Sequence, residues 1–553
     1  MRKPEILAPV GNMASLYAAI KGGADAVYLG SMWNARMRSK GFSSEELKKI
    51  ISYAHLHNCK VYITLNVLMF NNELQSALNF AVEMWNYGAD AFIVQDLGLA
   101  KILLDNIPEV ELHASTQMSV HTTAHAKYLK ELGFKRIVLA RELSIERIKK
   151  IYEETGIEVE VFVHGAMCYS FSGKCLFSFY KMNRSGNRGV CAQLCRLPFE
   201  KYEKGLLVDK GYLTSMKDMF VDKEILNELD FVSCLKIEGR YKSSNYVEDV
   251  VSYYKDLLKG KEPYPLKFQS LRGYCKGYYK SNDFIENVNK EKAKFSEGEK
   301  IGEVVKTGII KLNDYLGEGD LIQVGSEKIE VPKNSIVDGY LHLNNVRKNS
   351  KIKLLRRKQI PDFLKEIKPK KVRRVEKKQI KIKEIPKGEN YFMNYFDNKN
   401  ETDVSYNFKP QKEKIVHLPR VIFDDEIKEV KNWIENNEIK KIMVSDPGQA
   451  LIFRDCVDFI AYGPHGNVTN YFSYKLAKQI SDTVLVSFEY LGEDGAKLIC
   501  DHNELMISIH PFEVKEGSYT FIKDPKGNKI IVLKDFLGRR IFLQKTILNK
   551  RKV

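Results

Sequence analysis

The sequence predicts an α/β fold in which a TIM-type (β/α)8 barrel with an inserted cysteine loop is followed by a small β-barrel module and a C-terminal α/β lobe. Three observations support this prediction. Eight short apolar runs alternate with helical patterns over residues 1–260, and the runs around Thr64 and Ile93 lack the polar–apolar alternation of half-exposed strands. Short strand-like runs separated by turn residues fill 301–358. Strand and helix patterns then alternate again over 413–553.

The predicted barrel elements are short and follow one another with little linker. Ser43 or Ser44 marks the start of the second helix as its N-cap, because acidic residues follow in the first turn. The long excursion 165–232 lies between strands seven and eight. We expect strands at 5–10, 26–30, 60–66, 91–96, 111–116, 136–140, 158–164 and 233–238, with helices at 12–22, 43–57, 72–87, 97–106, 121–132, 144–155 and 243–259.

The part of the chain beyond the barrel divides by composition. We expect a connecting segment at 261–300, the small β-barrel at 301–358, a basic linker at 359–412 and the C-terminal lobe at 413–553. Cys456 and Cys500 stand alone in this lobe. It is therefore expected to do no chemistry itself and to serve architecture or RNA docking.

Bulk composition indicates a soluble globular protein with several domains. Hydrophobic residues make up 44% of the 553 residues, and no run approaches the roughly 20 apolar residues that a membrane span needs. The N-terminal sequence enters a strand at once, which leaves no room for a leader peptide. We expect a cytoplasmic protein with reduced thiols and no membrane partner; nothing in the sequence defines its oligomeric state.

Four of the nine cysteines fall within one irregular segment directly after the seventh predicted strand. Their spacing is C-x6-C-x15-C-x3-C, at Cys168, Cys175, Cys191 and Cys195. Zinc and iron–sulfur clusters are the usual occupants of four-thiolate sites, and structural zinc prefers two short C-x2-4-C knuckles. The long and uneven gaps favour a cluster over zinc, with four unligated thiols as the alternative. The missing C-x3-C-x2-C triplet argues against a radical-SAM enzyme.

Two cysteines are candidates for the fourth metal ligand of this set. Cys195 is preferred because only three residues separate it from Cys191, a distance that one turn of the chain can close. Cys234, just inside the eighth predicted strand, is the alternative, and we expect it to form buried wall instead.

Polar residues follow nearly every predicted strand, where the catalytic face of such a barrel lies. Three arginines among them, Arg36, Arg141 and Arg240, suit a dicarboxylate because guanidinium binds carboxylates bidentately. The wider set is Asn34, Gln95, Asp96, Ser115 and Glu142, and the residues predicted to be catalytic are Arg36, Asn66, Gln117, Arg141, His164, Glu238 and Arg240.

Several of these residues also have a purely structural interpretation. Asp96 is placed to cap the following helix, and His164 to pack in the core. Asn66 and Ser115 are placed to satisfy the backbone at strand ends, while Glu238 and Arg240 are spaced to pair with each other. Glu160 alternates with valines, so it is expected to point into the barrel, where a carboxylate needs an Arg or Lys partner.

The net charge of +17 is concentrated in one block. Residues 351–383 hold 15 Lys/Arg and 3 Asp/Glu, or +12, a pattern that attracts phosphate polymers. Upstream, 270–284 interleaves aromatic and basic residues, which can stack bases and bind phosphates. A solvated linker and a packed β-hairpin are the alternatives. The predicted RNA-binding residues are Arg272, Tyr274, Lys276, Arg356, Arg357, Lys370, Lys371, Arg373 and Arg374.

These motifs carry a family resemblance. HGAMCYSFSGKC at 164–175, followed by RGVCAQLCR at 188–196, resembles the signature of the collagenase-like peptidase family U32. The resemblance extends to LAPVGNMASLYAAIKGGADAVYLG at 7–30, to NAR at 34–36 and to SCLKIEGR at 233–240. It implies an enzyme similar to anaerobic-type hydroxylases, which place a hydroxyl group on an RNA pyrimidine or a quinone ring. It further implies a 4Fe–4S cluster on the four cysteines and, for the RNA enzymes, prephenate as co-substrate.

The expected function is therefore C5 hydroxylation of an RNA pyrimidine without dioxygen. The extra modules after the barrel favour a 23S rRNA cytidine as the target, and a tRNA uridine is the alternative. RNA and the iron–sulfur assembly machinery are the expected partners. A collagenase-like peptidase is a second class, although the sequence holds neither H-E-x-x-H nor G-x-S-x-G. A non-catalytic RNA-binding scaffold with a structural metal is the third.

Overall fold

A computed structural model gives the arrangement of most of the chain. Three residues of the predicted sites, Arg36, Arg357 and Arg374, lie outside the described part. The described residues are 3–35, 41–267, 270–280, 287–291, 300–312, 316, 319–344, 346–348, 350, 352–356, 367–373, 375, 404–406, 410–489, 502–508, 520–537 and 539–545.

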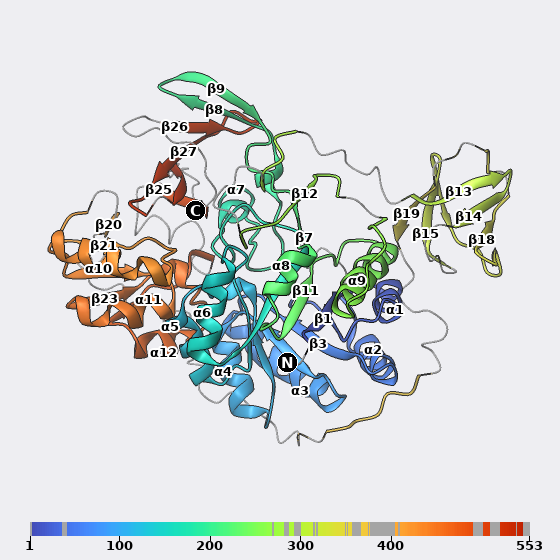
Figure 1. Cartoon of the computed structure of the whole chain (residues 1–553), viewed down its shortest axis with the longest axis horizontal. Helices are drawn as coiled ribbons and strands as arrows, with labels where there is room; N and C mark the ends of the chain where they lie inside the picture. Colours follow the sequence, from blue (N-terminus) through green and yellow to red (C-terminus); the bar gives the residue numbers. More distant parts are fainter. Residues whose placement is uncertain are drawn as a thin grey trace.

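Eight parallel strands form a closed barrel, as predicted (Figure 1). Each strand pairs with the next in sequence order, and the last strand pairs with both the first and the seventh, which closes the sheet. Nearly all strand residues are buried, because helices cover the outer face. The strands are β1 (Glu5–Pro9), β2 (Ala26–Gly30), β3 (Lys60–Leu65), β4 (Ala91–Val94), β5 (Leu112–Ala114), β6 (Arg136–Val138), β7 (Glu158–Ala166) and β11 (Cys234–Ile237).

Helices alternate with these strands, and all of them except α3 begin at a side chain that accepts a hydrogen bond from the first turn. Ser43 is the N-cap of α2: its side chain accepts from the backbone NH of Glu46 in a full capping box, which resolves the predicted choice between Ser43 and Ser44. Asp96 caps α4 through Leu99, so its structural interpretation is confirmed. The barrel helices are α1 (Met13–Lys21), α2 (Ser44–Leu56), α3 (Asn71–Asn86), α4 (Leu97–Asn106), α5 (Thr123–Leu132), α6 (Ile145–Thr155), α8 (Lys223–Glu228) and α9 (Ser244–Leu258).

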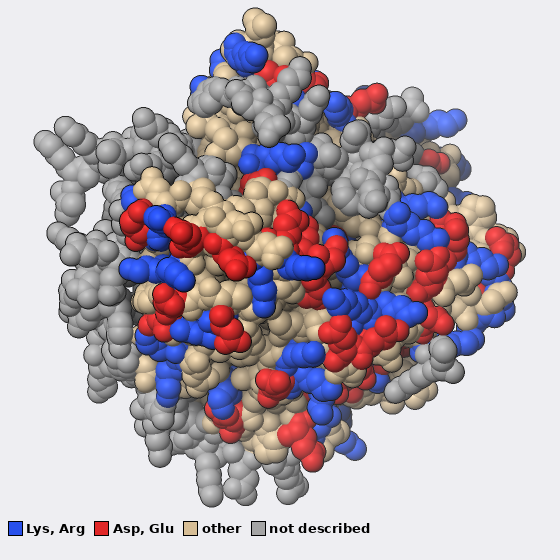
Figure 2. Space-filling model, turned by 60° about the vertical axis from the view of Figure 1, so that its left-hand side comes forward, with Lys and Arg blue, Asp and Glu red and all other residues tan. Residues whose placement is uncertain are grey.

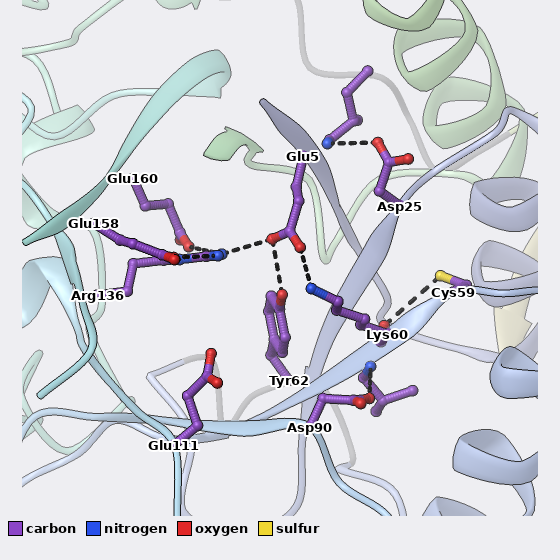
Figure 3. A network of polar contacts seen from close by, with 12 residues as sticks. Glu5, Asp25, Cys59, Lys60, Tyr62, Asp90, Glu111, Arg136, Glu158 and Glu160 are labelled. Atoms are coloured by element: carbon purple, nitrogen blue, oxygen red, sulfur yellow. Dashed lines mark hydrogen bonds and ion pairs between the residues drawn. The ribbon is translucent and has the colours of Figure 1, made fainter. Parts of the chain in front are cut away.

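The N-terminal ends of the strands enclose a network of charged side chains, which we call the barrel floor (Figure 3). Arg136 of β6 lies 2.8 Å from Glu5 of β1 and 3.7 Å from Glu160 of β7, and Lys236 of β11 donates to Glu160 at 2.8 Å. Burial alone raises the pKa of Glu5, but Arg136 and Lys60 outweigh it and lower this pKa to about 2. The expected inward position of Glu160 beside Arg and Lys partners is confirmed.

A long insertion between β7 and β11 starts and ends at the opposite, C-terminal rim of the barrel. Its last strand runs antiparallel to β7, with Met219 opposite Gly165. The insertion contains the short helix α7 (Phe177–Met182), the 3-10 turn η2 (Leu194–Arg196), a hairpin of β8 (Phe199–Glu203) and β9 (Leu206–Gly211), and β10 (Asp218–Phe220).

A separate antiparallel sheet follows the barrel and stands apart at the right of Figure 1. It has its own apolar core, built around buried residues such as Ile322, Leu341 and Ile352. No pairing between β16 and β17 closes this sheet among the described residues. Its strands are β13 (Lys300–Lys306), β14 (Ile309–Leu312), β15 (Leu321–Val324), β16 (Glu327–Glu330), β17 (Ile336–Val337), β18 (Tyr340–His342) and β19 (Ile352–Arg356).

Part of the basic block is anchored to the barrel. The backbone NH groups of Val372 and Arg373 donate to the carbonyl oxygen of Asn86, at the end of α3. The Arg373 guanidinium lies 3.7 Å from the centre of the Trp85 ring and donates to the carbonyl oxygen of Ala89 at 2.7 Å. These contacts hold the charged group of Arg373 against the barrel, and its RNA-binding role stays a prediction.

The C-terminal lobe combines a parallel sheet with a second, antiparallel one. The parallel strands are β20 (Val404–Tyr406), β21 (Ile415–His417), β22 (Lys441–Val444), β23 (Phe459–Tyr462) and β24 (Thr483–Val484), with helices α10 (Ile427–Asn436), α11 (Pro447–Phe453) and α12 (Tyr471–Gln479). The later strands β25 (His502–Ser508), β26 (Thr520–Lys523), β27 (Lys529–Lys534) and β28 (Arg540–Lys545) join the β8–β9 hairpin of the insertion in one six-stranded sheet.

The lobe docks on the side of the barrel formed by α4 and α5. Asn470, the N-cap of α12, donates to Asp96 at 2.8 Å and to the carbonyl oxygen of Met69 at 3.0 Å. Gly98 lies beneath this contact, and a Cβ atom there would stand 2.0 Å from Oδ1 of Asn470. A glycine is thus required for the two helices to approach so closely.

Two observations concern the helices and one face of the exterior. In the part of the chain that the structure describes, no helix has both the length and the apolar character needed to cross a bilayer. Figure 2 shows Lys and Arg interspersed with Asp and Glu over the face it displays. The excess positive charge of the chain does not gather into one patch on that face.

Candidate active site at the rim of the barrel

All four predicted cysteines line one cavity at the C-terminal rim of the barrel. The cavity has a volume of about 120 Å³, several times the roughly 30 Å³ that one water molecule occupies. Cys168 follows β7, Cys175 precedes α7, Cys191 precedes η2 and Cys195 lies within it, and all four are free thiols. Gln117 and Arg141 of the rim line the same cavity.

Backbone conformation brings the loop onto the rim. Gly173 has φ +74°, and a Cβ atom there would lie 2.2 Å from the carbonyl oxygen of Gln117. The second half of the loop is held by the Ser178 hydroxyl, which accepts from the NH of Ala192 at 2.8 Å. The Thr214 hydroxyl donates to the carbonyl oxygen of Cys195. The thiols are therefore positioned by the polar contacts of their neighbours.

The electrostatics of the cavity disfavour free thiolates. Burial raises the pKa of Cys168 and Cys175 and brings that of Cys195 to about 12, and the neighbouring cysteines add to each rise. Four thiolates so placed need a positive centre to remain charged together. This donor set therefore fits a bound metal group better than a set of reactive nucleophiles.

The spacing of the donors bears on the kind of metal group. Within the described ranges, no three or more His, Cys, Asp or Glu side chains come close enough to hold a single metal ion. A polynuclear centre takes one thiolate per metal atom and so suits donors spread around a cavity. Soft sulfur donors without histidine also match iron–sulfur chemistry.

The alternative fourth ligand, Cys234, lies at the other end of the barrel. It pairs in register with Glu5 of β1 and Glu160 of β7, and it is fully buried. It is therefore part of the barrel wall beside the charged floor. The structure brings Cys195, and not Cys234, to the cavity with the other three thiols.

Arg141 and Arg240 lie at the rim, each held by a neighbouring oxygen. Nη1 of Arg141 donates to the carbonyl oxygen of Ala166 at 2.8 Å, and its Nη2 lies 3.7 Å from Glu238. Nη1 of Arg240 donates to Oδ1 of Asn34 at 3.1 Å. These contacts fix both guanidinium groups near the mouth of the barrel.

Asn66 and Gln117 keep their predicted places at strand ends. The Asn66 side chain accepts from the NH of Ala35 at 3.0 Å and donates to the Ser115 hydroxyl at 3.4 Å, so it links the ends of β2, β3 and β5. The Ser115 hydroxyl accepts from the NH of Gln117. Asn66 thus also fulfils its structural alternative, whereas Gln117 faces the cysteine cavity.

His164 is packed in the core, as its structural interpretation expects, and its catalytic role stays a prediction. It is buried among Phe220, Tyr246 and Tyr274, and its Nδ1 lies 3.3 Å from the Tyr254 hydroxyl. Burial lowers its pKa to about 3, so it stays neutral. It is absent from the residues that line the described cysteine cavity, and the packed interpretation describes it better.

The aromatic and basic segment after the barrel is packed rather than free for stacking. Arg272 forms an ion pair with the buried Asp218, and the Tyr274 ring packs 5.4 Å from that of Phe220. Tyr278 and Tyr279 are buried. Both Arg272 and Tyr274 take part in packing the insertion, and their RNA-binding roles stay predictions.

The remaining predicted RNA-binding residues keep that role as a prediction. Lys276 is more than half exposed and lies 2.7 Å from Asp222. Lys370 and Lys371 are exposed. Arg356 belongs to β19 of the separate sheet.

Two residues around the cavity, Met506 and Glu489, were not predicted, and a third, Glu142, was predicted at the rim but not as a catalytic residue. Glu142 accepts from the NH and hydroxyl of Ser172 at 3.0 and 3.2 Å, and burial raises its pKa to about 7 although Ser172 and Arg141 lower it. Met506 of β25 lines the cavity, and Glu489 holds the loop between Cys175 and Cys191. Glu142 was recognisable as a rim residue; Met506 and Glu489 lie about three hundred positions away and carry no local signal.

The part of the chain that contains the barrel resembles known proteins. A sequence profile of peptidase family U32 matches residues 11–287. The chain is 38% identical over 257 residues to the 23S rRNA 5-hydroxycytidine C2501 synthase of Escherichia coli, which covers 46% of this chain and 39% of that enzyme. It is 37% identical over 329 residues to the tRNA hydroxylation protein P of Helicobacter pylori, which covers 54% of this chain and 77% of that protein.

A relative with a different name matches the same region. The collagenase of Porphyromonas gingivalis is 32% identical over 293 residues, which covers 50% of this chain and 67% of that protein. The match thus spans less than half of the Escherichia coli enzyme and about two thirds or more of the other two proteins.

Proposed function

The chain belongs to peptidase family U32, and on this premise we propose that it is an enzyme that hydroxylates an RNA pyrimidine at C5 without dioxygen. A 4Fe–4S cluster is its proposed cofactor, and a 23S rRNA cytidine its proposed target. The observation that carries the proposal is the single cavity shared by four cysteines and the polar rim of the barrel. The two relatives named for rRNA and tRNA hydroxylation support it.

The proposed roles follow from where the side chains lie. Cys168, Cys175, Cys191 and Cys195 would hold the cluster, which when bound would supply a redox or Lewis-acid centre. Arg141 and Arg240 would bind the two carboxylates of the oxygen donor, for which prephenate is the proposed compound. Gln117, which faces both the cavity and the rim, would orient the base by hydrogen bonding through its amide.

A tRNA uridine is the second candidate target. The specific observation in its favour is the Helicobacter pylori relative, because the match extends over 77% of that tRNA hydroxylation protein. The modules after the barrel favour the ribosomal target. Comparing the modified nucleosides of rRNA and tRNA from a gene-deletion strain by mass spectrometry separates the two. Loss of a one-oxygen mass increment at a 23S cytidine is the expected result.

Proteolysis is disfavoured by the chemistry of the cavity. A cysteine nucleophile needs a lowered thiol pKa, whereas burial raises the pKa of Cys168, Cys175 and Cys195. Because one relative is named a collagenase, cleavage of collagen should still be assayed. Iron and acid-labile sulfide in anaerobically purified protein, with no cleavage of denatured collagen, is the expected outcome; metal-free protein that cleaves collagen would overturn the proposal.

A further inference from the structure

The C-terminal lobe contacts the cysteine loop at four places along its length. The first contact is made by β25. The NH of Phe171 donates to the carbonyl oxygen of Ile507 at 2.8 Å, and the Ser508 hydroxyl donates to the carbonyl oxygen of Tyr169 at 2.8 Å. These bonds fix the three residues that directly follow Cys168. All the groups involved are buried, so water does not replace the bonds when they break.

The second contact surrounds Lys174, which stands next to Cys175. The Lys174 ammonium is buried, donates to the carbonyl oxygen of Ser445 at 2.9 Å and lies 3.7 Å from Asp446. The Arg420 guanidinium, also buried, donates to the carbonyl oxygen of Lys174. A buried ammonium needs such partners, and here the lobe provides them.

The third contact lies midway between Cys175 and Cys191. The buried carboxylate of Glu489 accepts from the Ser185 hydroxyl and from the side-chain amide of Asn187 at 3.0 Å. The barrel holds the other side of this turn: the NH of Leu68 donates to the carbonyl oxygen of Asn187 at 3.0 Å. The turn is therefore clamped between the barrel and the lobe.

The fourth contact follows Cys195. Strand β26 pairs antiparallel with β8, so that Lys523 stands opposite Glu200 and Phe521 opposite Tyr202. The Tyr202 and Phe521 rings stack with centroids 4.9 Å apart. The lobe also enters the cavity itself, because Met506 of β25 forms part of its wall beside the four thiols.

From these four contacts we infer that the C-terminal lobe is a positioning element for the cysteine cavity. Glu489, Ser508 and Lys174 hold the loop in the shape that brings the four thiols to one cavity, and Met506 completes its wall. The inference rests on the proposed function only in naming the bound group as an iron–sulfur cluster. The clamp itself is a property of the protein without metal, which allows a separate test.

The test compares Glu489→Ala in the full-length chain with the unchanged protein and with Glu438→Ala. Glu438 lies in the same lobe and is exposed, with Lys412 as its partner, so it is a matched control. In metal-free protein, the alkylation rate of each cysteine by iodoacetamide is followed by mass spectrometry. Cys59 and Cys234, both buried in the barrel, report whether the whole fold has loosened.

We expect Glu489→Ala to raise the alkylation rates of Cys175 and Cys191 about tenfold, since the charged acceptor of two buried hydrogen bonds is removed. Cys59 and Cys234 should react as slowly as in the unchanged protein. Glu438→Ala should change none of these rates. Unchanged rates at Cys175 and Cys191 in well-folded Glu489→Ala would overturn the inference.

A milder variant covers the case in which Glu489→Ala does not fold. Ser508→Ala removes one hydrogen bond to the backbone beside Cys168 and should raise the hydrogen-exchange rate of the neighbouring buried amide of Phe171 about threefold. An unchanged rate there contradicts the clamp. Iron content is measured in parallel: if the unchanged protein binds no iron, the proposed function fails, while the alkylation rates still decide the role of the lobe.

Discussion

The two ends of the barrel treat buried charge in opposite ways. At the floor, Arg136 and Lys60 lower the pKa of Glu5 to about 2, although burial alone would raise it. At the rim, burial raises the pKa of Glu142 to about 7 and that of the Cys195 thiol to about 12. The floor thus neutralises its charges within the protein, whereas the rim leaves groups that a ligand or metal can still satisfy. One end serves stability and the other chemistry.

The largest effect is expected from breaking the floor. Arg136→Ala removes the cation between Glu5 and Glu160 and should lower the free energy of unfolding by about 4 kcal/mol, because two carboxylates remain buried without it. Urea unfolding followed by circular dichroism measures the change. Arg147→Ala is the control: this arginine pairs with Asp425 at the surface and should cost less than about 1 kcal/mol. Equal losses in the two variants would contradict the contrast drawn between floor and surface.

The second largest effect is a loss of stability at low pH, caused by protonation of Glu5 in the barrel floor. The pKa of Glu5 is lower in the folded protein than its ordinary value of 4.5, so its contribution is complete above pH 4.5 and is lost as pH falls towards 2. The lost free energy of unfolding is about 3 kcal/mol at 1.36 kcal/mol per pKa unit. Unfolding measured between pH 5 and pH 2 should show this slope, and Glu5→Gln should flatten it while being less stable at pH 7.

At the rim, loss of one thiol should affect chemistry and leave stability almost unchanged. Cys175→Ser is expected to lower bound iron and to reduce RNA hydroxylation at least about 100-fold, since each cysteine is a proposed metal ligand. Iron analysis and nucleoside mass spectrometry measure these losses. Cys234→Ser, at the other end of the barrel, should retain its iron. Iron loss in Cys234→Ser alone would reverse the assignment of the fourth ligand.

A smaller effect is expected at the proposed carboxylate site. Arg141→Lys keeps the charge but removes the planar fork, so the KM for prephenate should rise about tenfold with little change in the KM for RNA. Steady-state hydroxylation assays measure both constants. Arg147→Lys, a surface arginine on α6, should change neither. A rise confined to the KM for RNA would indicate that Arg141 binds RNA and not the oxygen donor.

The barrel could be predicted from the sequence because its signals are local. Buried parallel strands form short continuous apolar runs, and each of the eight predicted ranges overlaps an observed strand. The rim residues followed from the rule that polar groups after such strands share one face. The cysteine loop was recognisable from spacing alone.

The contacts that the sequence does not show are those between residues far apart in the chain. Arg272 and Arg373 resembled free cations, because a sequence does not show that Asp218 and the Trp85 ring lie beside them. His164 at a strand end resembled a rim group, yet aromatic rings from β10, α9 and β12 enclose it. Glu489 escaped notice for the same reason, since its partners Ser185 and Asn187 are some three hundred residues earlier.

The pairing of β26 with β8 sets an order of events during synthesis. Residue 203, the end of β8, leaves the ribosome 317 residues before residue 520, the start of β26, so roughly 15–60 s pass at 5–20 residues per second. Throughout that interval the outer edge of the nascent hairpin lacks its neighbour, and exposed edges invite mispairing. Insertion of the proposed metal centre into a finished pocket would have to wait until translation has passed β26, so that it would follow the synthesis of most of the chain.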